Sequence, residues 1–97
     1  MTVVAFVPDL MDRSRISGVV GDVTFVSSVD GLLAAPADVV VVDLQRVPDL
    51  AALAAIESRC IGFAPHVDSE LIERARAVGC EAMARSRFFR EVDDLIG

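Results

Sequence analysis

Short apolar runs of strand length alternate with helix-like stretches along the chain, at intervals of roughly twenty residues. This alternation is typical of a βα repeat. Four consecutive valines in the third run suit a strand that is covered on both faces, whereas the fifth run is the weakest because Ala and Glu have little strand preference. The predicted strands are Val3–Val7, Val23–Val26, Val39–Val42, Cys60–Ala64 and Glu81–Ala84.

Helical periodicity is strongest over residues 68–78, where the apolar side chains fall on one face. We expect Asp68 or Ser69 to cap this helix and Gly79 to end it. A last helix, which Ser86 is placed to cap, turns an apolar stripe from Phe88 onward toward the sheet. The other predicted helices cover about residues 11–20, 29–35 and 48–58, with Leu50, Leu53 and Ala54 facing inward in the last of them.

Five strands joined by helices through right-handed crossovers predict an α/β fold. The simplest arrangement is a flavodoxin-like (βα)5 three-layer sandwich, in which a parallel five-stranded sheet has the order 2-1-3-4-5. The 97 residues are enough for one domain over residues 1–97, with no room for a second.

Composition and charge argue against several classes of function. The chain is 54% hydrophobic, which predicts a folded core, and its net charge of −6 argues against a nucleic-acid-binding surface. All nine basic residues are Arg, so the absence of Lys excludes phosphate binding through a P-loop Lys and Schiff-base chemistry. With no basic leader and no apolar stretch of about 18 residues, we expect a cytoplasmic protein that does not associate with membranes.

Cysteine spacing and nucleophile motifs give no sign of a metal site or an enzyme. Cys60 and Cys80 lack the spacing of a zinc site or a CxxC pair, and we expect both to be small buried hydrophobes. No serine lies in a GxSxG turn, and His66 has no Cys beside it. We therefore expect no catalytic activity.

The carboxyl ends of the predicted strands are where ligands bind in open parallel sheets. Asp43 follows four buried valines, so its carboxylate must face the crevice or the start of a helix, because burying it in the core would be costly. One interpretation is that Asp43 caps the next turn and Asp9 caps the first helix. The other is that both carboxylates form an oxygen-rich patch that suits Mg²⁺.

Further polar residues follow the fourth and fifth strands. His66 is either a solvated loop residue or, with the N-terminus of helix 68–78, part of an anion pocket that includes Arg85, Ser86 and Arg87. The alternative is that Arg85 and Arg87 lie in a solvent-exposed loop, where their positive charges balance the negative charges of nearby acidic residues. Phe89 lies off the core stripe, and its ring either tucks under a loop or contacts a partner.

The five βα units resemble the receiver domain of two-component response regulators over essentially the whole chain. The closest stretch is "ELIERARAVGCEAMARSRFFREVDDLI", which is similar to the receiver from its fourth helix to its fifth. Asp43 falls on the phospho-acceptor position, and Asp9 on an acidic position after the first strand. Pro8 replaces the second acidic residue, Ala64 the Thr or Ser after the fourth strand, and Ser86-Arg87 the Lys-Pro pair after the fifth.

The resemblance implies a degenerate, pseudo-receiver domain in which the missing hydroxyl and Lys argue against phosphorylation of Asp43. We expect a stand-alone signalling or regulatory module that acts through protein contacts, with an effector or a His kinase as partner or as a homodimer. By resemblance, the face formed by residues 68–78, 81–84 and 86–96 makes these contacts, through Arg74, Arg87, Phe89 and Arg90. The alternative is a small-molecule or anion binder, conceivably a weak hydrolase, that uses Asp9, Asp43, His66 and Arg85.

Overall fold

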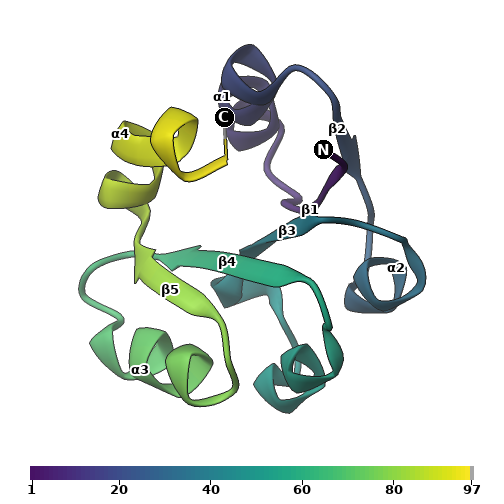
Figure 1. The fold of residues 1–97 in the computed structure, drawn as a ribbon. Coiled ribbons are helices and arrows are strands. Elements are labelled where there is room, and N and C mark those ends of the chain that lie inside the picture. The colour runs from purple at the N-terminus through teal and green to yellow at the C-terminus, as the bar shows by residue number, and fades with distance from the viewer. Residues whose placement is uncertain (97) are drawn as a thin grey trace.

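A computed structural model of the protein describes residues 1–96 and shows strands and helices alternating along the chain (Figure 1). The third connection, between β3 and β4, contains two 3₁₀ helices in place of an α-helix. In chain order the elements are β1 (Val3–Phe6), α1 (Leu10–Val20), β2 (Val23–Phe25), α2 (Val29–Ala34), β3 (Val39–Asp43), η1 (Leu44–Arg46), η2 (Leu50–Ala55), β4 (Arg59–Ala64), α3 (Ser69–Ala77), β5 (Glu81–Ala84) and α4 (Arg85–Ile96).

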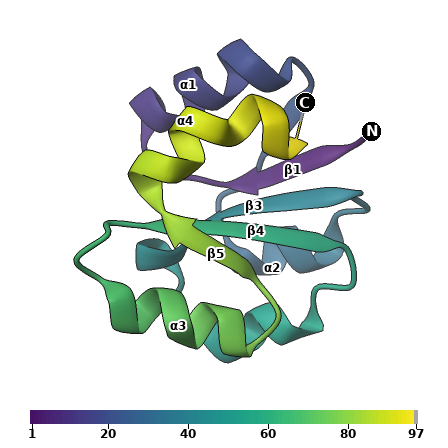
Figure 2. The ribbon, with the colours of Figure 1, turned by 60° about the vertical axis from the view of Figure 1, so that its left-hand side comes forward.

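The five strands form one parallel sheet in the order β2-β1-β3-β4-β5, which confirms the predicted flavodoxin-like α/β fold. Helices α1 and α4 cover one face of the sheet, while α2, η2 and α3 cover the other (Figures 1 and 2). Because all strands run in the same direction, their carboxyl ends meet at a single edge.

The core is divided by the sheet into two apolar clusters, and β3 contributes to both. Val40 and Val42 pack with Leu32, Leu53 and Ile72 beneath the α2 and α3 side. Successive side chains of a strand point to opposite faces, so Val39 and Val41 pack instead with residues of α1 and α4. Burying each valine stabilises the fold by about 1.5–3 kcal/mol, which is why the first four residues of this strand are apolar.

The prediction of an α-helix over residues 48–58 is wrong. The chain there forms the short 3₁₀ helix η2, whose first turn is capped by the Asp49 carboxylate. Leu50 and Leu53 are buried and Ile56 is partly buried, a spacing of three that matches the three residues per turn of a 3₁₀ helix, whereas Ala54 is exposed.

The capping predicted for the last two helices also differs in the structure. The last helix begins at Arg85, directly after β5, so Ser86 lies within its first turn and does not cap it. Asp68 precedes α3, but its carboxylate makes no capping bond and instead accepts a hydrogen bond from Gln45 Nε2 at 2.7 Å. Gly79 does end α3, with a φ of +94°.

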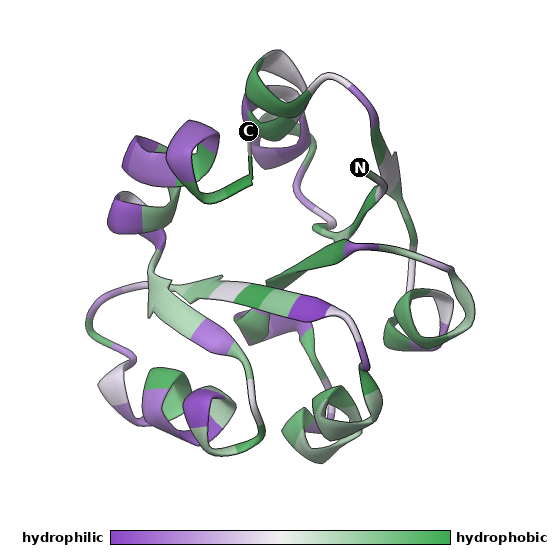
Figure 3. Cartoon of the chain, viewed as in Figure 1, coloured by the Kyte–Doolittle hydropathy of each residue, from purple (hydrophilic) through white to green (hydrophobic). Residues whose placement is uncertain are grey.

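Figure 3 shows that most of the strand ribbon is green, with purple polar segments in β4 and β5, whereas α4 is largely purple and α3 carries both purple and green segments. Within residues 1–96, no helix combines the length and the apolar character needed to cross a membrane.

Candidate functional site at the carboxyl edge of the sheet

Three of the four side chains predicted to converge are neighbours at the carboxyl edge. Asp9 follows β1, Asp43 ends β3 and Arg85 follows β5. The pKa of Arg85 is raised, mainly by its hydrogen bonds to Asp12 and in smaller part by the negative charges of Asp43 and Asp9. The edge therefore holds a group of carboxylates around one guanidinium.

Asp9 is the N-cap of α1. Its Oδ1 accepts hydrogen bonds from the backbone amides of Met11 at 2.9 Å and Asp12 at 3.0 Å. These bonds satisfy two amides that have no partner inside the helix, so the capping interpretation of Asp9 is confirmed.

Asp43 is buried, with 8% of its surface exposed, although it lies at the rim of the sheet. Its Oδ1 accepts a hydrogen bond from the Gln45 amide at 3.3 Å and caps η1, as the capping interpretation predicted. Burial raises the pKa of Asp43 above its usual value of 3.8, and this effect outweighs the Gln45 hydrogen bond and the positive charge of Arg46.

The strongest polar contact at the edge is an ion pair between α4 and α1. Arg85 donates from both terminal guanidinium nitrogens to Asp12, at 3.0 Å to Oδ2 and 2.5 Å to Oδ1. The Asp12 side chain is 6% exposed, whereas that of Arg85 is 38% exposed. Two parallel charge-assisted hydrogen bonds fix the guanidinium plane and hold Arg85 in one orientation at this edge.

An aromatic cluster packs against the Arg85 guanidinium. Phe63 at the end of β4 stacks on Phe88, with ring centroids 4.9 Å apart, and Phe89 meets both rings at 5.3 and 5.0 Å. The Arg85 guanidinium carbon lies 5.0 Å from the Phe89 centroid and 5.6 Å from that of Phe63, and Arg15 covers Phe89 at 4.0 Å. Cation–π attraction and the ion pair therefore hold Arg85 in the same position.

Other predicted anion-binding residues lie on the surface near this edge. His66 is exposed in the turn between β4 and α3, and Ser86 and Arg87 are exposed in the first turn of α4. Arg87 Nε donates to Glu91 at 3.1 Å. Within residues 1–96, the hydrogen bonds and ion pairs at the carboxyl edge do not include His66, so the anion pocket stays a prediction.

The predicted partner-contact residues occupy α3 and α4, beside the outer strand β5. Arg74 on α3 and Arg87 and Arg90 on α4 are exposed. Phe89 is partly buried within the aromatic cluster, so most of its contacts are made inside the chain. Three of the four residues thus have free surface for a partner.

The carboxylates fit a Mg²⁺ ion poorly. Asp9 and Asp43 each have one oxygen engaged by backbone amides, and the neighbouring Asp12 is neutralised by Arg85. The Arg85 guanidinium is therefore held among these carboxylates, and its positive charge would repel a divalent cation. Over the described part of the chain, no group of three or more His, Cys, Asp or Glu side chains is arranged to hold a metal ion.

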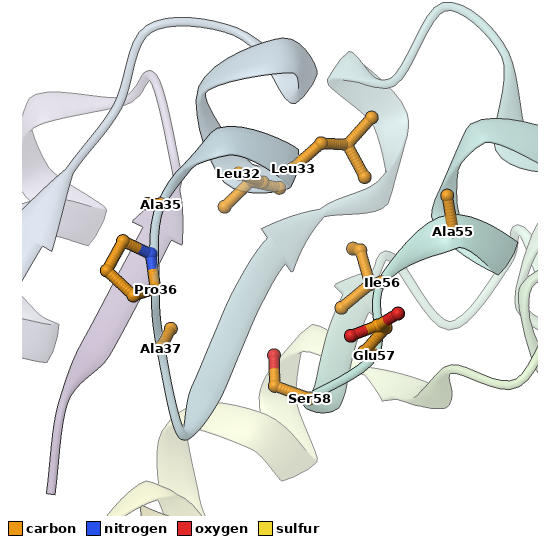
Figure 4. A pocket seen from close by; sticks show the side chains of 9 residues that line it. All are labelled: Leu32, Leu33, Ala35, Pro36, Ala37, Ala55, Ile56, Glu57 and Ser58. Atoms are coloured by element: carbon orange, nitrogen blue, oxygen red, sulfur yellow. The ribbon is translucent and has the colours of Figure 1, made fainter.

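The opposite edge of the sheet has a hollow of about 380 Å³ between the end of α2 and the end of η2 (Figure 4). Leu32, Leu33, Pro36 and Ile56 line it, with Glu57 as the charged residue at its rim. None of the predicted site residues borders this hollow, so it is separate from the carboxyl edge.

The sequence-based prediction did not include Asp12, which is the acidic partner of Arg85 at this edge. The available signal was its position four residues before Ile16 on α1, which places both on the same inward helix face. Its partner Arg85 is 73 residues away, so the sequence alone offered no local sign of the pairing.

No family model matches the sequence, and no curated protein or solved structure is similar enough to count as a match.

Proposed function

We propose that this chain is a receiver-like regulatory domain that acts by contacting other proteins, independently of phosphorylation at Asp43. The observation that carries the proposal is the Asp12–Arg85 ion pair at the carboxyl edge, close enough to Asp43 for both charges to act on that carboxyl group. A guanidinium that is already bound by two hydrogen bonds and held over two rings is a poor mobile partner for a phosphoryl group.

The residues around Asp43 support this mode of action. Ala64 ends β4 and has no hydroxyl that could donate to a phosphoryl oxygen. A phosphoryl group on Asp43 would add negative charge close to Asp12, with Arg85 already compensating Asp12. Phosphorylation would therefore be electrostatically disfavoured, and an edge held by this ion pair suits a domain with one constant surface.

The contacting surface in this proposal is formed by α3, β5 and α4, where Arg74, Arg87 and Arg90 are exposed. The test is affinity capture from the native cytoplasm with the wild-type chain, Arg74→Glu and Arg90→Glu. Asp22→Arg, an equally large charge reversal in the exposed turn before β2, is the control. A specific partner that is lost in the first two variants and kept in the control supports the proposal.

Capture that is equal in all four proteins would contradict this surface assignment. Sedimentation of the same proteins tests the homodimer, which the two arginine variants should dissociate. The competing hypothesis of an anion binder predicts a rise in melting temperature with inorganic phosphate that disappears in both His66→Ala and Arg85→Ala.

A further inference from the structure

Two buried cysteines face each other beneath α3. Cys60 is the second residue of β4, and Cys80 lies between the end of α3 and β5. Both thiols are free and only 6% and 5% exposed, and their Sγ atoms are 3.4 Å apart. The prediction that each is a small buried residue is confirmed, but spacing in the sequence did not reveal that the two sulfurs touch.

Strand register explains this proximity. Ile61 of β4 pairs with Glu81 of β5, so the residues that precede them, Cys60 and Cys80, are also neighbours. Adjacent strands lie about 4.8 Å apart, which is within the range of roughly 4.4–6.8 Å between the Cα atoms of a disulfide. The sulfurs would need to approach by only about 1.4 Å to reach the bonded distance of roughly 2.05 Å.

Gly62 leaves the space that the Cys80 thiol occupies. A Cβ atom at position 62 would lie 2.8 Å from Cys80 Sγ and 2.7 Å from Leu44 Cδ2. Any larger residue would therefore displace the thiol, and the glycine keeps it close to Cys60.

We propose that Cys60 and Cys80 form a reversible intramolecular disulfide on exposure to a peroxide. The bond would connect β4 to the turn that precedes β5 and close a loop that contains α3. This inference goes beyond the proposed function and does not depend on it. Disulfides inside cells are mostly transient and redox-sensing, so such a bond would serve as a response to oxidant.

The chemistry needs only the two thiols and the peroxide. The Cys60 thiolate attacks one peroxide oxygen, the O–O bond breaks, and Cys60 becomes a sulfenic acid while the other oxygen leaves as hydroxide, which takes up the thiol proton to give water. Cys80 then attacks the Cys60 sulfur, the S–O bond breaks, and the departing hydroxide leaves with the Cys80 proton as a second water. The two sulfurs together lose two electrons, which reduce the peroxide.

The thiol–thiol contact favours Cys60 as the first nucleophile. In the reduced pair the Cys60 thiol donates to Cys80 Sγ. Once Cys60 is ionised, the Cys80 thiol can donate to the Cys60 thiolate instead, and this hydrogen bond lowers the pKa of Cys60. The same contact, together with burial, raises the pKa of Cys80. Hydrogen peroxide is little larger than water, so a brief local opening near the Gly79 turn is sufficient to admit it.

The test treats the reduced, folded full chain with hydrogen peroxide and then digests it with trypsin under non-reducing conditions. Because trypsin cuts after arginine, we expect residues 60–74 and 77–85 to be recovered as one linked peptide that dithiothreitol separates. The intact mass should fall by two hydrogen atoms, and the denatured chain should lose both alkylation sites. The oxidised protein should also melt higher, by about 10 °C, because the loop is closed in the unfolded state.

Cys60→Ala and Cys80→Ala are the controls. Cys80→Ala should stop at the sulfenic acid, which dimedone traps on Cys60, and neither variant should show the rise in melting temperature. A wild-type chain that keeps both alkylation sites after peroxide, gains oxygen without a link, or links only to another chain would overturn the proposal.

Discussion

Arg85, the first residue of α4, donates two hydrogen bonds to the Asp12 carboxylate on α1, although 73 residues separate them. The pair connects the two helices that cover one face of the sheet (Figure 2). Asp12 is the more deeply buried partner, so the two sides of the ion pair should respond differently to substitution.

Arg85→Met should destabilise the protein by about 1–2 kcal/mol, because it leaves the buried Asp12 carboxylate without its counter-charge. The loss is smaller than for a fully buried pair because Arg85 is 38% exposed and partly screened by solvent. Urea unfolding near neutral pH measures this difference in the free energy of unfolding.

Arg87→Met is the matched control for that substitution. Arg87 belongs to the same helix turn and is paired with Glu91, but its side chain is 54% exposed. It should cost less than about 0.5 kcal/mol. Equal losses in the free energy of unfolding for the two arginine variants would mean that the Asp12–Arg85 pair does not stabilise the fold.

Asp43→Asn should become relatively more stable than the wild type as pH rises. Burial raises the pKa of Asp43 in the folded state above 3.8, so the folded chain binds the proton more tightly than the unfolded chain. Wild-type stability therefore falls as pH rises from the unfolded value through the raised folded value, and the variant lacks this loss. Urea unfolding of both proteins from about pH 3 to pH 7 isolates the contribution of this carboxyl group.

A difference between the two proteins that is independent of pH would contradict the burial of the Asp43 carboxylate. The opposite slope, with the wild type gaining stability relative to the variant as pH rises, would indicate that the folded state prefers the ionised form.

Glu81→Gln should have a small effect that depends on salt and pH. Arg59 donates to both Glu81 oxygens, at 2.6 and 2.9 Å, and this lowers the pKa of Glu81 below 4.5. The contribution is present above pH 4.5 and is lost as pH falls through the lowered value. Because both side chains are at least 40% exposed, we expect a loss of about 0.5 kcal/mol that high salt reduces. A loss of more than about 2 kcal/mol in the free energy of unfolding that salt does not change would contradict the solvent-exposed position of the Arg59–Glu81 pair.

Two glycines with open space around them should respond to alanine in opposite directions. Gly18 lies within α1, so Gly18→Ala should stabilise the protein by about 0.5–1 kcal/mol through helix propensity. Gly79 has a φ of +94°, so Gly79→Ala should destabilise it by about 1 kcal/mol or more. Thermal unfolding distinguishes the two, and a shift of the same sign in both would show that backbone conformation at Gly79 is not limiting.

Much of the fold could be predicted because its signals are local. The four valines of β3 and the spacing of the other apolar runs were enough to predict the parallel sheet and its strand order. The prediction for residues 48–58 failed because Leu50 and Leu53, three residues apart, fit either kind of helix. The prediction placed Ala54 inward, as an α-helix would, whereas Ile56 completes the repeat of three that a 3₁₀ helix makes.

The candidate site could be predicted only in part, since its key contact is long-range. Strand ends placed Asp9, Asp43 and Arg85 at one edge, and capping was one of the two interpretations that their positions left open for both aspartates. The partner of Arg85 and the stacking of Phe63 beneath it depend on how α1, β4 and α4 pack, which no local pattern specifies.

The phosphoryl analogue beryllofluoride tests the central claim most directly. Amide spectra of the wild-type chain and Asp43→Asn are compared with and without beryllofluoride and Mg²⁺. We predict no saturable shift in the wild type, including at the Ala64 and Arg85 amides, because Arg85 is already bound to Asp12 and Ala64 has no hydroxyl to donate. Saturable shifts there that disappear in Asp43→Asn would show a working phospho-acceptor and contradict the proposal of phosphate-independent action.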